Sequence, residues 1–114
     1  MAECLFCRIA AKEIPAQVVY EDELVMAFRD INPQAPVHVL IIPKGHVASL
    51  REIEEAHPLV AGRLLRVARD VAVQEGVSDS GYRLVVNTGR DAGQAVAHLH
   101  FHLLGGRALC WPPG

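Results

Sequence analysis

Residues 98–106, HLHFHLLGG, hold three of the six histidines of this 114-residue chain, at alternate positions. Successive side chains of a β-strand point to opposite faces, so His98, His100 and His102 are expected to share one face of a strand. The apolar residues between and after them would form the opposite face, which can pack against a helix. The stretch therefore predicts an amphipathic strand that carries a row of imidazoles.

This row of imidazoles indicates a functional site. Each ring needs hydrogen-bond partners, and a neutral imidazole is a nucleophile, a general base or a metal ligand near physiological pH. The alternative is that the three are ordinary polar residues on an exposed sheet face. One ion cannot bind all three, because alternate residues of a strand lie roughly 7 Å apart and a Zn–N bond is about 2 Å. The pattern favours a catalytic site, or one that combines catalysis with a metal.

The rest of the chain predicts an antiparallel α+β domain. Apolar and β-branched runs indicate strands, and an apolar stripe at helical spacing, followed by Gly76 as a suitable cap, indicates one long helix. Strands and helices do not alternate regularly, which argues against a parallel sheet. We expect one domain, residues 1–114, with a sheet of about five strands, a long helix and a short N-terminal helix. The expected strands are residues 16–22, 24–30, 37–43, 81–89 and 98–104, and the expected helices are residues 5–11 and 56–75.

The composition excludes several classes of protein. With 51% hydrophobic and 21% charged residues, the chain can bury a core. A net charge of -2 without a basic stripe gives no reason to expect a nucleic-acid partner. No apolar run approaches the roughly 20 residues of a membrane span, and the first residues lack a signal-peptide pattern, so we expect a cytoplasmic protein without a membrane partner. Three cysteines argue for free thiols or a metal site rather than a disulfide framework.

Cys4 and Cys7 form a CxxC motif that has three interpretations: two buried small residues, a redox pair or two metal ligands. A thioredoxin-like redox motif follows a strand, and only three residues precede this one. A structural zinc site needs two further ligands. The sequence offers them only at a distance, and His46 and His98 are the candidates.

Two further segments carry polar groups suited to a nucleotide. In residues 87–95, NTGRDAGQA, glycines let main-chain N–H groups approach an anion, and Asn87 and Gln94 offer side-chain donors. The alternative is an ordinary glycine-containing turn. The carboxylate of Asp30 can accept hydrogen bonds from two vicinal hydroxyls of a ribose, although a lone Asp before Ile-Asn-Pro is also typical of a turn.

The pattern HLHFHLL, with NTGRDAGQAVA before it and GGRALCWPPG after it, resembles the histidine triad (HIT) family and, within it, the Hint branch of nucleotide phosphoramidases. The segments EIPAQVVYEDE and VHVLIIPKGHV extend the resemblance over nearly the whole chain. It implies hydrolysis of purine nucleoside 5'-phosphoramidates, such as AMP linked to an amine. It also implies a covalent nucleotidyl-His100 intermediate, which water hydrolyses to a nucleoside monophosphate.

The resemblance also assigns roles to individual residues. His100 attacks the α-phosphorus, and His102 and His38 contact the phosphate or the leaving group. Asp30 binds the ribose. The phosphate is bound by Asn87, Gly93, Gln94 and the main chain at Ala95, and an apolar slot for the base is formed by Leu5, Phe6, Ile9, Phe28 and Ile31. Some Hint members carry a serine where Ala95 stands, which puts the rate in doubt more than the type of reaction.

The resemblance further implies a structural zinc ion bound by Cys4, Cys7, His46 and His98, and no cofactor for catalysis. Other Hint members lack the cysteines and bind no metal there. It implies a homodimer in which two sheets join and Trp111 contributes to the dimer and to specificity, whereas a frayed terminus is the alternative. Two other functions remain open. One is a dinucleoside polyphosphate hydrolase of the same family, and the other is a zinc-stabilised nucleotide-binding regulatory module with little turnover.

Overall fold

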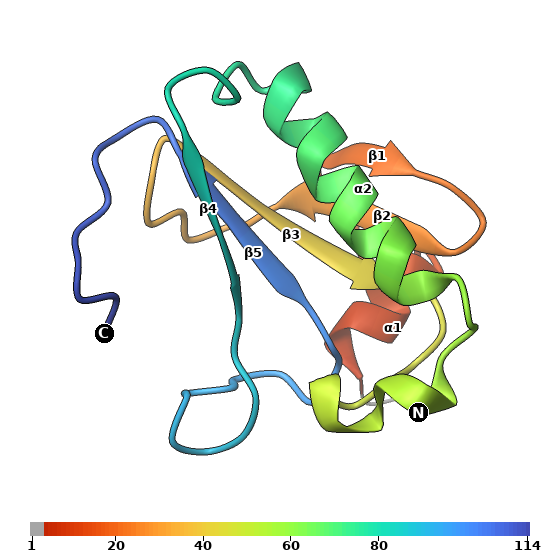
Figure 1. Ribbon diagram of the computed structural model, residues 1–114. Helices are drawn as coiled ribbons and strands as arrows, with labels where there is room; N and C mark the ends of the chain where they lie inside the picture. Colours follow the sequence, from red (N-terminus) through yellow and green to blue (C-terminus); the bar gives the residue numbers. More distant parts are fainter. Residues whose placement is uncertain (1–3) are drawn as a thin grey trace.

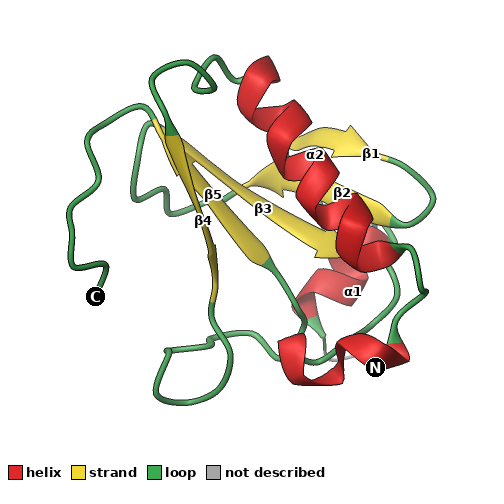
Figure 2. Ribbon diagram, viewed as in Figure 1, coloured by secondary structure: helices red, strands yellow, loops and turns green. Residues whose placement is uncertain are grey.

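The computed structural model describes residues 4–114, which form one sheet with helices on both of its faces (Figures 1 and 2). Its elements are α1 (Leu5–Ala10), β1 (Val18–Glu21), β2 (Val25–Arg29), β3 (Val37–Pro43), a 3-10 helix (Leu50–Glu55), α2 (Val60–Gln74), β4 (Tyr82–Val86) and β5 (Phe101–Gly105). The sheet order is β1-β2-β3-β5-β4, and every neighbouring pair is antiparallel. The predicted α+β class, the five strands and the two α-helices are confirmed.

The two faces of the sheet carry different cores because the side chains of each strand alternate. In Figure 1, α2 crosses one face, and its buried stripe packs against β2, β3 and β5. The buried residues of this core include Val25, Ala27, Val39, Ile41, Leu64, Val67, Val71, Leu99 and Leu103. A smaller core on the opposite face joins α1 to β2 and β3 through Phe6, Ile9, Met26, Phe28, Leu40 and Ile42. The strand histidines, His38 and His102, lie on this second face, because they alternate with Val39 and Leu103 of the first core.

Four predicted boundaries differ from the structure by two residues or more. The strand predicted at residues 81–89 ends at Val86, and the strand predicted at residues 16–22 begins at Val18. The last strand begins at Phe101 rather than at His98, and its pairing with both neighbours begins there, with Ile41 of β3 and Val86 of β4. The segment before β5 is bound instead to a loop, where the Leu99 N–H donates to the Val47 carbonyl at 2.6 Å. The long helix begins at Val60 rather than at residue 56, because the chain first makes a separate 3-10 helix and then passes Pro58. Its predicted end is confirmed, since Gly76 follows the cap with a positive φ of 77°.

None of the helices within residues 4–114 combines the length and the apolar character that crossing a bilayer requires.

Candidate functional site

Main-chain partners fix which nitrogen of His100 carries the proton. The Nδ1 atom lies 2.7 Å from the carbonyl oxygen of His98, which can only accept a hydrogen bond. Nδ1 is therefore the protonated nitrogen of the neutral ring, and Nε2 keeps a free lone pair. The His100 side chain is buried, and its ring centroid lies 5.1 Å from that of His102. This is the tautomer that a nucleophilic imidazole requires.

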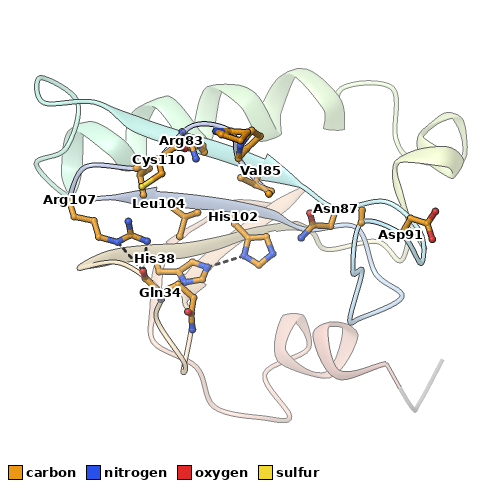
Figure 3. Close-up of a pocket in the computed structure, with 15 residues that line it drawn as sticks. Gln34, His38, Arg83, Val85, Asn87, Asp91, His102, Leu104, Arg107 and Cys110 are labelled. Atoms are coloured by element: carbon orange, nitrogen blue, oxygen red, sulfur yellow. Dashed lines mark hydrogen bonds between the residues drawn. The ribbon is translucent and has the colours of Figure 1, made fainter.

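The proton on His102 is fixed through His38. The main-chain N–H of Gln34 donates to His38 Nδ1 at 3.0 Å, so the proton of the neutral His38 ring is on Nε2. That Nε2–H faces His102 Nδ1 at 2.9 Å, drawn as a dashed line in Figure 3, and Asp30 Oδ2 at 3.4 Å. Because His102 Nδ1 accepts this hydrogen bond, its Nε2 carries the proton. His102 is therefore oriented as an N–H donor beside the free lone pair of His100.

The rings of His38 and His102 are both neutral at pH 7. Burial lowers the pKa of His38, although Asp30 opposes the shift. Burial also lowers the pKa of His102 to about 4, and the neighbouring His100 and His38 act in the same direction. Neutral rings of defined tautomer are what the sequence predicts for at least part of the histidine row.

This burial predicts a loss of stability in acid. The unfolded chain protonates His102 near its ordinary pKa of about 6.5, whereas the folded chain does so only near pH 4. Between these values the unfolded state binds more protons, so stability falls as the pH falls through this window. We expect His102→Gln to remove roughly 2 kcal/mol of that loss. The measurement is the free energy of unfolding by denaturant at pH 7 and pH 4.5.

The exposed His57 supplies the matched control for this experiment. His57→Gln should lose as much stability on acidification as the unmodified chain. An equal loss in His102→Gln would show that His102 is not the buried neutral group described here.

A cleft of about 780 Å³ opens beside His38 and His102 (Figure 3). His38, His102 and Asn87 line it together with two cations, Arg83 and Arg107, and one carboxylate, Asp91. Asn87 follows the end of β4 and lies toward the end of the cleft away from the two arginines (Figure 3). The cleft is large enough for part of a nucleotide and is positively charged on one side.

The loop at residues 87–95 uses one of its predicted phosphate ligands for its own structure. The Gln94 side-chain amide donates to the carbonyls of Ala48 and Val96, and its oxygen accepts from the Gly89 N–H. The N–H groups of Gly93 and Gln94 are also bonded inside the loop. Among the hydrogen bonds of the described residues, none uses the Ala95 N–H. Gln94 thus shapes the loop, and the exposed Ala95 carries the main-chain group that remains for an anion.

The residues predicted to bind ribose and base differ in accessibility. Asp30 and Ile31 line a hollow of about 500 Å³ that also includes Arg29. The Ile31 side chain is 99% exposed, so it offers its whole surface to a ligand. Phe28 is only 3% exposed and packs edge-on against Phe6. It therefore belongs to the core and offers little surface to a ligand.

The four predicted metal ligands lie together although they come from distant parts of the chain. One nitrogen or sulfur atom from each of Cys4, Cys7, His46 and His98 lies within 4.8 Å of all the others. Three of the sulfur–nitrogen distances are 3.3–3.5 Å, and the two Nδ1 atoms are 3.2 Å apart. A tetrahedral zinc ion with ordinary bond lengths separates its ligand atoms by roughly 3.3–3.8 Å. The geometry of the four residues therefore fits zinc.

The tautomer of His98 supports the same conclusion. Its Nε2 lies 2.9 Å from the carbonyl of Pro43, so this nitrogen carries the proton and Nδ1 faces the cysteines with a free lone pair. Metal-binding histidines usually donate their second ring nitrogen in this way. His38 shows the opposite arrangement, because its second nitrogen accepts from the Gln34 N–H. The neighbouring group Asp30, His38 and His102 is thus a hydrogen-bonded chain rather than a second metal site.

The C-terminal tail lies at the surface beside the cleft. Trp111 is 80% exposed, and the Arg83 guanidinium lies 5.9 Å from the centre of its ring. Arg83 also donates a hydrogen bond to the main-chain carbonyl of Cys110. The side chain of Cys110 is an exposed free thiol. Within the described chain, Trp111 therefore contacts the β4 edge of the sheet.

The sequence implies neutral histidine rings but does not identify the individual main-chain groups that set their tautomers. They are the Gln34 N–H and the carbonyls of Pro43 and His98. Every residue has such groups, so no sequence signal distinguishes them. Arg83 and Arg107 were also missed, because scattered arginines become one charged surface only in the fold.

Comparison with known proteins decides the family. The family model described as "HIT domain" matches residues 11–109. The chain belongs to the HIT family. A purine nucleoside phosphoramidase from Escherichia coli (strain K12) is 50% identical to this HIT protein over 107 residues, which cover 94% of this chain and 90% of the relative. The resemblance inferred from the sequence is confirmed.

Two further relatives of this HIT protein bear on its activity and its metal cluster. The crystal structure of a HIT family hydrolase from Legionella pneumophila Philadelphia 1 has a TM-score of 0.94 and 52% identity, and the match covers 98% of this chain and 100% of the other. The expectation of a hydrolase is confirmed by these matches. A "14 kDa zinc-binding protein" from Zea mays is 57% identical over 112 residues, covering 96% of this chain and 87% of the relative.

Proposed function

We propose that this HIT hydrolase cleaves the P–N bond of purine nucleoside 5'-phosphoramidates through a covalent intermediate on His100. The observation that carries the proposal is the pair of opposite tautomers, a free Nε2 lone pair on His100 beside an N–H donor on His102. A HIT relative named purine nucleoside phosphoramidase, 50% identical, supports the substrate class.

The chemistry follows from the two rings. The Nε2 lone pair of His100 attacks the α-phosphorus, a P–N bond to His100 forms, and the P–N bond to the amine breaks. The leaving nitrogen must take up a proton, which His102 Nε2 is placed to donate. Water then attacks the phosphorus, His102 takes back a proton, and His100 is released together with the nucleoside monophosphate.

His102 must gain a second proton before it can act as an acid, and its surroundings allow this. The negative charge of a bound phosphate favours the protonated ring and raises its pKa above the value in the free protein. His38 Nε2–H would then oppose the new Nδ1–H of His102. Asp30 Oδ2, 3.4 Å from His38 Nε2, gives that hydrogen an alternative acceptor. His38 and Asp30 thus adjust to the charge of His102.

The remaining residues are assigned to binding. The phosphate lies between Asn87, the free main-chain N–H of Ala95, and the rings of His100 and His102, with Gly93 and Gln94 holding the loop in shape. The guanidinium groups of Arg83 and Arg107 add favourable charge to the cleft for an anionic substrate. The ribose and base occupy the side of Asp30 and the exposed Ile31.

The four-residue cluster is assigned to a structural zinc ion that completes the docking of α1 on the sheet. Its ligands are two thiolates and two imidazoles, so all four positions are filled by the protein and none remains for a substrate. No cofactor is required for the chemical steps described above.

We also propose that two copies join through β4 into one continuous sheet. β4 is an end strand of the sheet, and its outer main-chain groups can pair with a second strand. Trp111, which is exposed beside Arg83 of this strand, would then lie close to the partner.

Side-by-side rates on two substrates test the proposed activity. We expect kcat/KM for an AMP–amine conjugate to exceed that for a diadenosine polyphosphate by at least about 100-fold, because His102 is placed to protonate an amine leaving group. Release of AMP and amine is followed by chromatography. The opposite preference would favour the dinucleoside polyphosphate hydrolase, and tight AMP binding without amine release would favour the regulatory module.

A further inference from the structure

The short helix α1 carries Cys4 at its cap, Cys7 within it and, between them, Phe6. The Phe6 ring reaches both the metal cluster and the nucleophile. Its centroid lies 5.9 Å from that of His98 and 5.1 Å from that of His100, edge-on to each, with interplanar angles of 79° and 77°. Phe6 thus contacts a metal ligand and the attacking residue at the same time.

The ring of His100 is held by one hydrogen bond and lies between two neighbouring rings. Its Nδ1–H is bonded to the main-chain carbonyl of His98, and the rings of His102 and Phe6 lie beside it. His98 is itself tied to the Pro43 carbonyl and faces the cysteines. Two of the restraints on the nucleophile therefore lead back to the metal cluster, one through the main chain of His98 and one through Phe6.

The helix itself depends on those contacts. α1 has only six residues, and a helix this short is not stable without tertiary contacts. The residues that hold it are the two cysteines of the metal cluster and the apolar side chains Phe6 and Ile9. When the cysteines are bound with His46 and His98, the turn that carries Phe6 is fixed on both sides.

We propose that Phe6 is a positioning residue for His100, and that the metal cluster sets the rate of the reaction by holding Phe6 against this ring. The proposal rests on the function proposed above, in which His100 is the nucleophile. It differs from a role of Phe6 in the base slot, because Phe6 is only 5% exposed and has little surface for a purine. A base-slot residue acts mainly on KM, whereas a positioning residue acts on kcat.

The test is Phe6→Leu in the full-length, zinc-loaded protein on an AMP–amine substrate. We expect kcat to fall about tenfold or more and KM to stay within twofold. Zinc content should remain that of the unmodified protein. Side-chain ¹⁵N NMR should show the single Nδ1–H tautomer of His100 replaced by an averaged or mixed state. Ile42→Val is the matched control, because Ile42 is buried in the same core as Phe6 and should leave all four quantities unchanged.

Removing the metal tests whether the metal cluster acts on His100 through Phe6. Chelation of the unmodified protein should reduce kcat by the same factor as Phe6→Leu, and chelation of Phe6→Leu should add little, because both changes release the same ring. Phe6→Met provides the same comparison if the leucine variant does not fold.

An unchanged kcat, a rise in KM alone, or two independent and multiplying losses would overturn the proposal. His100→Ala separates it from the proposed function. If His100→Ala is inactive while Phe6→Leu keeps its kcat, only the role of Phe6 is wrong. If His100→Ala is fully active, the nucleophile assignment fails.

Discussion

Replacing His100 by alanine is expected to lower kcat on an AMP–amine substrate by roughly 10⁴-fold or more. The reason is that Nε2 of this ring is the atom proposed to bond to phosphorus, and no other described imidazole beside it offers a free lone pair in the same place. His102 Nε2 carries a proton, and His38 Nδ1 is occupied by the Gln34 N–H. Loss of the ring therefore removes the nucleophile rather than weakening it.

The measurement combines steady-state rates with intact-mass analysis of rapidly quenched reactions. The unmodified protein should show an added adenylyl group that maps to the peptide containing His100, and His100→Ala should show none. His57→Asn is the control, because His57 is exposed and only accepts a hydrogen bond from the Leu59 N–H. Equal hydrolysis by His100→Ala and the unmodified protein would exclude the covalent mechanism. A wild-type rate without any adduct would point to direct attack by water.

The fold could be predicted where the signals are local. The strand at residues 37–43 is confirmed with both boundaries, because a β-branched apolar run ends at Pro43, and Gly76 marks the end of α2. The start of α2 was wrong because the choice between a 3-10 helix and an α-helix near Pro58 depends on packing. The start of β5 was wrong because the segment before Phe101 is bound to a loop through the Leu99 N–H and the Val47 carbonyl, a contact that no local signal marks.

The site, like the fold, could be predicted where the signals are local and not where they depend on packing. Side chains with distinctive chemistry, the histidines and cysteines, could be assigned to two clusters, and the structure brings each cluster together. The partners that set the protonation pattern could not be identified from the sequence, because they are main-chain groups brought close by the fold. Gln94 shows that side-chain chemistry alone can also predict a binding role that the fold does not leave open. Its amide suits a phosphate by chemistry, but in the fold its nitrogen donates to the carbonyls of Ala48 and Val96 and its oxygen accepts from the Gly89 N–H.

Loss of the metal cluster is expected to have the largest effect on stability. Cys7→Ser should remove zinc binding and lower Tm by roughly 10–20 °C, because a tightly bound ion at about 1,000 times its Kd adds about 4 kcal/mol to the folded state. The same change should follow when the unmodified protein is treated with a strong chelator. The α1 helix should open first, since both cysteines and Phe6 hold it to the sheet.

Elemental analysis and thermal unfolding with and without chelator measure this effect, and hydrogen exchange locates it. Cys110→Ser is the matched control, because the third cysteine is an exposed thiol in the tail, away from the cluster. It should keep one zinc ion per chain and an unchanged Tm. A zinc content far below one per chain in the unmodified protein, or a Tm that chelation does not move, would exclude a structural ion. The four residues would then stabilise α1 only through their mutual hydrogen bonds, at a small fraction of the expected free energy.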